Sequence, residues 1–244
     1  MPGGPNAPEG RMNDRQVLDE QMAYYRARAG EYDEWFFREG RYDRGLEHRA
    51  QWFQEVSTVE AELKTAAPRG DVLELACGTG LWTRHLLETA ERVTAVDASP
   101  GTIAVNRERI RSDRVEYVVA DIFSWTPPQR FDFALFTFWL SHVPSSRFDA
   151  FWAMLARAVR PGGRVFFVDS LLTQESTARD HATVDDSGIV RRKLNDGREF
   201  DIVKIFYEPT GLEPRLAALG WRGDVRSSGQ FFVYGSVTHD GAAR

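Results

Sequence analysis

The sequence contains a single cysteine, Cys77, so no disulfide can form within the chain and no cysteine cluster can hold a metal ion. It also lacks any stretch that approaches the roughly 20 consecutive apolar residues of a membrane-spanning helix. Residues 1–10 are rich in Pro and Gly and have no apolar centre, which argues against a secretory signal peptide. We therefore expect a cytoplasmic protein without a bound metal, and a disordered tail over residues 1–14.

Clusters of basic residues are also missing. The net charge is −5 at pH 7, and no long run of Lys and Arg occurs. This balance provides no electrostatic attraction to nucleic acid or to an anionic membrane surface. A length of 244 residues with 42% hydrophobic residues fits one globular domain. We expect a soluble protein that acts on small molecules, with neither nucleic acid nor membrane as a partner.

The stretch from Val72 to Gly80 predicts a buried strand that runs into a glycine turn. Its short apolar run, bounded by turn signals, is typical of a parallel strand, with Glu74 near the strand's end. Gly78 and Gly80 lack a Cβ atom, so their backbone can approach a ligand closely. Apolar residues at helical spacing from Leu81 to Ala90 then predict a helix whose N-terminus faces that ligand.

Predicted strands and helices alternate after this turn. The strands are expected at residues 72–75, 92–96, 115–119, 131–138 and 164–168. One helix begins at Ser99-Pro100, a favoured helix start, and another spans Phe148 to Val159 and is broken by Pro161-Gly162-Gly163. This alternation predicts an α/β fold, a doubly wound, Rossmann-like parallel sheet with right-handed crossovers.

The flanking segments predict a helical cap and an inserted hairpin. Between Val17 and Phe37, many aromatic residues beside charges suggest short helices folded over a cleft. Apolar residues at three- and four-residue steps from Leu46 to Leu63 predict an amphipathic helix. Asn195-Asp196-Gly197 is a strong turn signal and predicts a hairpin over Ile189–Phe206. A helix and two strands are expected to close the chain, at residues 213–219, 224–226 and 231–237.

Four acidic residues lie at or just before the carboxyl ends of predicted strands: Glu74, Asp97, Asp121 and Asp169. Ligands of doubly wound sheets bind beyond these ends, so the four residues describe an organised pocket. Asp97 lies 17 residues after Gly80 (97 minus 80), near the spacing of about 20 at which an acid accepts hydrogen bonds from ribose hydroxyls. Asp121 is placed to accept from an exocyclic amine such as that of adenine. Together they predict a nucleoside ligand.

The glycine turn excludes two common nucleotide sites. A dinucleotide site uses G-x-G-x-x-G, but residues 76–83 lack the third glycine and carry the bulky Trp82 close to its place. A P-loop needs Gly-Lys-Ser/Thr, which does not follow here. An adenosyl ligand without phosphates therefore fits better.

Five short motifs occur in order between Val72 and Asp169. They are Glu-Leu-Ala-Cys-Gly-Thr-Gly (74–80), Val-Asp-Ala-Ser (96–99), Ala-Asp-Ile-Phe (120–123), Phe-Asp-Phe-Ala (131–134) and Arg-Pro-Gly-Gly-Arg-Val (160–165). This ordered set resembles the successive motifs of class I S-adenosylmethionine-dependent methyltransferases of the small-molecule type. The resemblance implies a seven-stranded, mostly parallel sheet in which the closing strands insert one antiparallel strand. It also implies S-adenosyl-L-methionine as cofactor and S-adenosyl-L-homocysteine as product.

The resemblance implies roles at the methionine half of the cofactor. The residues that would surround this half are Glu74, Ala76, Gly78 and Gly80. Ala76 departs from the family pattern, since many members carry glycine there. The stretch Tyr-Tyr-x-x-Arg-Ala at residues 24–29 resembles a segment that caps the cofactor in small-molecule methyltransferases. Tyr24, Arg28 and Tyr32 would then close over the methionine end, or these aromatic residues only pack.

The resemblance also implies contacts to the rest of the cofactor. Asp97 would hold the ribose hydroxyls and Ala98 would contact adenine. Asp121, with the backbone of Ile122, would bind the edge of the adenine ring. Phe138 would lie near the sulfonium.

The substrate side is expected after the strand at 131–138, in the sequence Phe138 to Pro144. Family members that methylate bases of nucleic acids tend to carry Asn/Asp-Pro-Pro-aromatic here, and this chain does not. His142 is a candidate general base, because imidazole titrates near pH 6.5, or else a structural histidine that shapes the loop. Trp139 and Asp169 are further substrate-side candidates, although Asp169 fits equally well as a strand-end cap. In the hairpin, residues 191–193 (Arg-Arg-Lys) either attract an anionic substrate or form a solvated strand face.

These observations predict a methyltransferase that uses S-adenosyl-L-methionine to methylate a small-molecule acceptor, with O-methylation favoured by His142. The transfer would be an in-line displacement organised mainly by positioning. The alternatives are N- or C-methylation of a metabolite, a non-catalytic regulatory binder of the cofactor, and an NAD-linked enzyme. The protein would be a monomer or a homodimer. We expect a single domain over residues 15–240, made of a helical cap (15–68), a cofactor-binding core (69–170), a substrate-side insertion (171–212) and closing elements (213–240).

Overall fold

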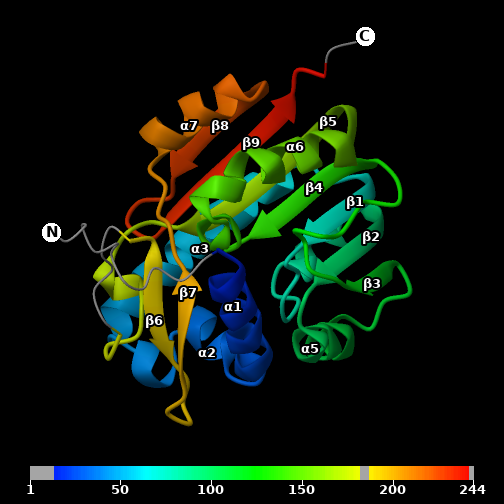
Figure 1. The fold of residues 1–244 in the computed structure, drawn as a ribbon. Coiled ribbons are helices and arrows are strands. Elements are labelled where there is room, and N and C mark those ends of the chain that lie inside the picture. The colour runs from blue at the N-terminus through cyan, green and yellow to red at the C-terminus, as the bar shows by residue number, and fades with distance from the viewer. Residues whose placement is uncertain (1–13, 182–186, 242–244) are drawn as a thin grey trace, which may run out of the picture.

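The computed structural model describes residues 14–181 and 187–241, and its central feature is a seven-stranded sheet (Figure 1). Its strands lie in the order β3-β2-β1-β4-β5-β9-β8. They are β1 (Gly70–Leu75), β2 (Ala90–Asp97), β3 (Val115–Val119), β4 (Phe131–Thr137), β5 (Val159–Ser170), β8 (Trp221–Ser227) and β9 (Phe232–His239). From β1 the chain proceeds outward through β2 to β3, and β4 then starts on the other side of β1. A ligand crevice is expected at this point of reversal, beyond the carboxyl ends of β1 and β4.

One strand of the sheet, β9, runs antiparallel to both of its neighbours. Val165 of β5 pairs with Val237, and Val225 of β8 pairs with Gly235. The pairs among β1, β2, β3, β4 and β5 are parallel. The predicted fold, a doubly wound Rossmann-like sheet with one antiparallel strand, is therefore confirmed.

Apolar residues of the central strands point alternately to the two faces of the sheet, as the pleat requires. In β1, Val72 packs with apolar residues of α3, α4 and α5, whereas Leu73 and Leu75 pack with those of α6 and α7. These helices are α3 (Leu46–Ala66), α4 (Thr83–Leu86), α5 (Pro100–Ile110), α6 (Phe148–Ala158) and α7 (Pro209–Ala218). Within the residues described, no helix combines the length and the apolar content needed to cross a membrane.

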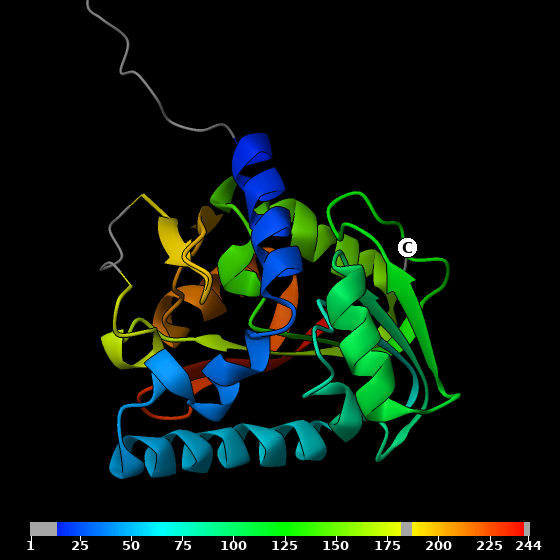
Figure 2. The same cartoon turned by 90° about the horizontal axis from the view of Figure 1, so that it is seen from below.

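A helical cap and a separate hairpin lie at the carboxyl end of the parallel strands. The cap contains α1 (Asp14–Arg28) and α2 (Tyr32–Phe37), and the hairpin consists of β6 (Ile189–Lys193) and β7 (Glu199–Val203). Figure 2 shows α1 between this hairpin and α5. The side chain of Gln21 accepts a hydrogen bond from the Val203 N–H at 3.1 Å, which joins α1 to β7. Short 3-10 helices connect the larger elements at Gly40–Tyr42, Leu140–His142, Ser145–Arg147 and Gln174–Ser176.

Three local predictions need correction. The stripe from Leu81 to Ala90 does not form one helix, because α4 covers only Thr83–Leu86 and Ala90 opens β2 beside Gly70. Pro161-Gly162-Gly163 does not separate a helix from a strand, since β5 passes through it with an irregular register against β4. Of the predicted tail, residues 1–13 lie outside the described residues, and Asp14 is the first residue of α1.

Candidate functional site

A cavity of about 330 Å³ lies beyond the carboxyl ends of β1 to β4, with α1 along its opposite side. The predicted site residues that line it are Tyr32, Ala76, Gly78, Asp97, Ala98, Asp121, Ile122, Phe138, Trp139 and His142. The predicted site residues outside its wall are Tyr24, Arg28, Glu74, Gly80 and Asp169. From α1, side chains at three- and four-residue steps complete the wall, among them Leu18, Met22 and Tyr25.

The glycine turn after β1 owes its shape to residues with positive φ. Ala76, Gly78 and Gly80 have φ values of 51°, 51° and 88°. The amide of Asn106 donates to the carbonyl oxygens of Cys77 and Gly78, each at 3.3 Å, and so fixes the turn from α5. Gly78 therefore lines the cavity with backbone alone, while Gly80 lies against Asn106.

Replacing Gly80 by Ala is expected to lower the melting temperature and to weaken cofactor binding. A Cβ atom at Gly80 would lie 2.6 Å from Oδ1 of Asn106, the residue that holds the turn. Gly197→Ala is the matched control, because Gly197 has a similar φ of 92° but no atom within 4 Å of its added Cβ. Both substitutions carry the backbone strain of positive φ, of order 1 kcal/mol, so only the excess loss at Gly80 reports the contact with Asn106. Equal losses in thermal denaturation would contradict this account.

Asp97 closes the site from the end of β2. Its Oδ2 accepts a hydrogen bond from the Gly78 N–H at 2.9 Å, and its Oδ1 accepts from the Ser99 N–H at 2.8 Å and from the Thr102 hydroxyl at 3.2 Å. Burial raises the pKa of Asp97, and these hydrogen bonds oppose the rise. The single hydrogen of the Thr102 hydroxyl also reaches the Ser99 carbonyl oxygen, at the shorter distance of 2.9 Å. When it is donated there, each carboxylate oxygen of Asp97 keeps one lone pair, so the site can accept from two adjacent hydroxyls.

Glu74 lies beneath the turn instead of in the cavity wall. It is 1% exposed, and its Oε2 accepts a hydrogen bond from the Thr83 hydroxyl at 2.7 Å. Its Oε1 has no hydrogen-bond partner among the described residues. Burial, together with the negative charge of Asp97, raises the pKa of Glu74 to about 8. The predicted role of Glu74 at the methionine half stays a prediction, and its observed contacts support the turn from below.

The far end of the cavity suits a flat group with an amine. Asp121 and Ile122 line it at the end of β3, and the Asp121 carboxylate accepts from the Phe123 N–H at 3.0 Å. The rings of Phe123 and Trp139 lie 5.5 Å apart and form an aromatic wall. An acidic acceptor beside aromatic and aliphatic surface can hold a purine ring by its edge and its face.

Both ring nitrogens of His142 already have partners. Nδ1 lies 2.7 Å from the carbonyl oxygen of Val203, so it must carry the proton, and Nε2 then accepts from the Tyr25 hydroxyl, also at 2.7 Å. Burial and the positive charge of Lys204 hold the pKa of His142 well below its ordinary value. A neutral imidazole locked between Val203 and Tyr25 positions the Tyr25 hydroxyl in the cavity wall.

A second, smaller cavity shares the wall residues Tyr25, Tyr32, Phe138 and His142 with the first. Tyr24 and Arg28 line this second cavity instead of the first, so their contact with the methionine end of the cofactor stays a prediction. The reason for their placement is helical geometry, because residues 24 and 28 share the face of α1 that meets the hairpin.

Asp169 takes part in the support of this second cavity. Its carboxylate accepts hydrogen bonds from the Ser141 N–H at 2.8 Å and the Ser170 N–H at 2.7 Å, and lies 3.6 Å from Nζ of Lys204. Asp169 is 1% exposed. Of its two predicted roles, this geometry favours the structural one, in which it holds the loop after β4 and positions Lys204.

Sequence reasoning missed Tyr25 and Lys204 as site residues. Tyr25 follows Leu18 and Met22 at helical steps of four and three residues, a signal that was available in the sequence. Lys204 carries no such signal, because only the pairing of the hairpin against α1 brings it to the cavity.

Comparison with known proteins places this chain beside methyltransferases. Residues 72–163 match a family described as a methyltransferase domain. Two solved structures of DhpI, one in complex with SAH and one with SAM and HEP, are each 40% identical in sequence to this chain. Their TM-scores are 0.76 and 0.77, and each match covers 93% of this chain and 98% or 100% of the other.

Curated relatives agree in kind but match over shorter regions. A malonyl-[acyl-carrier protein] O-methyltransferase of Serratia marcescens is 34% identical over 41% of this chain and 38% of its own length. A demethylmenaquinone methyltransferase of Clavibacter sepedonicus is 35% identical over 45% of this chain and 44% of its own length. An uncharacterized methyltransferase of Geobacillus kaustophilus is 27% identical over 57% of this chain. The chain spans 66% or less of the length of these relatives.

Proposed function

This chain belongs to the class I S-adenosylmethionine-dependent methyltransferases, and we propose that it transfers a methyl group to an oxygen atom of a small-molecule acceptor. The cofactor is S-adenosyl-L-methionine, in line with the SAH and SAM complexes of DhpI. A curated relative that is named an O-methyltransferase supports oxygen as the acceptor atom. The observation that carries the proposal is the pair of cavities that share one wall.

The residues of the first cavity fit this cofactor. Asp97 would accept from the two ribose hydroxyls, next to a turn where Gly78 presents only backbone. Asp121, Ile122 and the Phe123–Trp139 wall would hold the adenine ring. The methionine half would then extend along the turn toward the shared wall.

The shared wall is where the acceptor oxygen would meet the methyl group. When bound, S-adenosylmethionine supplies a methyl group that is activated by its sulfonium. Phe138 is held rigidly for this task, since its N–H donates to the Val168 carbonyl at 2.7 Å and its ring lies 4.7 Å from that of Trp35. Tyr25 donates its hydrogen to His142, so its oxygen keeps lone pairs that can accept a hydrogen bond from an acceptor hydroxyl. These residues would act by orienting the acceptor oxygen for in-line attack.

A screen of hydroxyl-bearing metabolites for S-adenosylhomocysteine release tests the proposal. We expect release that depends on one acceptor class, with the new methyl group on oxygen by NMR of the product. Cofactor binding without release from any acceptor would favour a regulatory binder instead. A product methylated on nitrogen or carbon would overturn the assignment to oxygen.

A further inference from the structure

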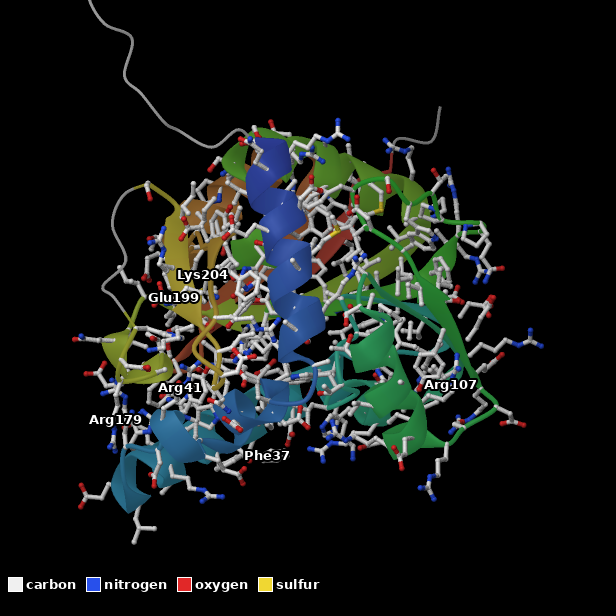
Figure 3. The ribbon with its side chains drawn as sticks, turned by 60° about the horizontal axis from the view of Figure 1, so that its bottom comes forward. Phe37, Arg41, Arg107, Arg179, Glu199 and Lys204 are labelled. Carbon is white, nitrogen blue, oxygen red and sulfur yellow. The ribbon has the colours of Figure 1, made fainter. Side chains whose placement is uncertain are left out.

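The second cavity is lined by three buried cationic side chains that arrive from different elements. Arg28 comes from α1, Arg192 from β6 and Lys204 from the residue after β7. Their exposures are 8%, 7% and 9%. Figure 3 shows Lys204 on the hairpin side of α1, with Arg107 of α5 on the opposite side. Packing of α1 against the hairpin thus concentrates positive charge at one place.

Only one of these three cations has a carboxylate partner within residues 14–181 and 187–241. Lys204 lies 3.6 Å from Oδ1 of Asp169 and donates to the Ser141 hydroxyl at 2.8 Å. Nε of Arg28 and Nη1 of Arg192 have no hydrogen-bond partner there. Among those same residues, no Asp or Glu lines the cavity. As far as the described residues go, two guanidinium groups are therefore buried without a neutralising charge.

The surroundings of Arg28 offset this cost only in part. Its guanidinium donates to the Tyr42 hydroxyl at 3.2 Å and lies over the rings of Tyr24 and Tyr32 at 5.5 and 5.0 Å. Such cation–π contacts contribute about 0.5–2 kcal/mol, whereas burial of an unpaired ion costs several kcal/mol. The buried Tyr24 hydroxyl also lacks a hydrogen-bond partner among the described residues. Unsatisfied donors and positive charge face the same space, which is the arrangement that an anion would complete.

In β6, only one of three consecutive basic residues, Arg192, faces the cavity. Arg191 points outward, where its guanidinium makes two hydrogen bonds to Asp201 at 2.8 and 2.9 Å. Lys193 is also exposed. Arg192, between them, enters the cavity because successive side chains of a strand alternate in direction. Of the two interpretations of residues 191–193, a solvated face fits Arg191 and Lys193, and contact with an anion fits Arg192.

We propose that this cavity binds an anionic group of the methyl acceptor, a carboxylate or a phosphoryl group, held by Arg28 and Arg192. The proposal rests on the proposed methyl transfer, because the cavity reaches the cofactor only through the shared wall. A guanidinium offers a planar fork of donors that matches oxyanions. The Tyr24 hydroxyl, which has no hydrogen-bond partner among the described residues, can donate to a remaining anion oxygen. Anchored by its charge, the acceptor would present its nucleophilic oxygen at Tyr25 and Phe138.

The test uses S-adenosylhomocysteine-loaded protein with inorganic phosphate, acetate and neutral acetamide as probes, at matched ionic strength in chloride. Isothermal titration calorimetry measures binding to wild type, Arg192→Gln and Arg191→Gln. We expect at least one anion to bind, acetamide not to bind, and Arg192→Gln to lose about tenfold or more in anion affinity, as for a hydrogen bond to a charged group. Arg191→Gln, the exposed neighbour, is expected to match wild type.

Two controls separate this proposal from failed folding and from the proposed function. S-adenosylhomocysteine affinity should be equal in all three proteins, and Arg192→Gln in buffer free of oxyanions should melt no lower than wild type, because an uncompensated charge is removed. No anion binding, equal losses at Arg191 and Arg192, or clear destabilisation by Arg192→Gln would each overturn the proposal. Anion binding is measured without turnover, so retained binding with no methyl transfer to any anionic acceptor would instead contradict the proposed function.

Discussion

Replacing Asp97 by Ala is expected to weaken binding of S-adenosylmethionine and S-adenosylhomocysteine by about 100-fold or more, since hydrogen bonds to a charged group contribute about 1.5–3 kcal/mol each. The substitution removes the acceptor for two ribose hydroxyls. It also removes the partner of the Gly78 N–H, at 2.9 Å, and of the Ser99 N–H, at 2.8 Å. The turn would therefore lose its side-chain contact to β2 at the same time as the ligand loses its own, and would keep only the backbone hydrogen bond from the Cys77 N–H to the Val96 carbonyl. Isothermal titration calorimetry with S-adenosylhomocysteine measures the loss directly.

Asp97→Asn and Glu116→Ala are the informative controls. Asparagine keeps one acceptor oxygen but turns an NH₂ group toward either the Gly78 or the Ser99 N–H, so its affinity is expected to fall between those of wild type and Asp97→Ala. Glu116 is an exposed acid on the adjacent strand β3, and its loss should leave affinity unchanged. Undiminished affinity in Asp97→Ala would remove Asp97 from the cofactor site.

The part of the site that could be predicted from the sequence is the part built from local chemistry. Gly78 and Asp97 lie on neighbouring strand ends, and the rule that parallel strands present their carboxyl ends at one edge is sufficient to bring them together. The same rule brought Asp121 and Ile122 to the cavity wall. The boundaries of β1 to β4 were also predicted to within two residues, because short apolar runs between turn signals leave few alternatives.

The remaining predictions depended on distant partners or on competition between local structures. Tyr24 and Arg28 were assigned to the cofactor, but the face of α1 that they occupy meets a hairpin far away in the sequence. The spacing of apolar residues in α1 does not predict which of its faces packs against the hairpin and which lines the cofactor cavity. The helix expected up to Ala90 ends early because Ala90 gains strand pairing beside Gly70, a tertiary contact that outweighs helical spacing. Lys204, which was not predicted, likewise reaches the site because the hairpin packs against α1.

Replacing His142 by Gln is expected to reduce kcat by about 10- to 100-fold through misplacement of Tyr25, with little change in cofactor affinity. The Tyr25 hydroxyl would lose its acceptor at Nε2, and the loop after β4 would lose its bond to Val203. If His142 acts through Tyr25, the double variant His142→Gln/Tyr25→Phe should be no slower than the slower single variant, as a double-mutant cycle would reveal. If the change in ln kcat of the double variant equals the sum of the changes in the two single variants, the two residues act independently.

The pH dependence decides whether His142 positions Tyr25 or takes up a proton itself. Burial and the charge of Lys204 keep the pKa of His142 well below 6.5, so the imidazole stays neutral as the pH falls from 7 to 6. The pH profile of kcat/KM should therefore show no inflection near 6.5 that is due to His142. An inflection near 6.5 that disappears in His142→Gln would contradict this expectation and would identify His142 as the titrating base. Stability gives an independent measure, since the unfolded chain binds a proton at His142 near pH 6.5 and the native protein does not. Wild type should therefore lose stability below pH 6.5 more steeply than His142→Gln, because burial of a neutral histidine opposes protonation only in the folded protein.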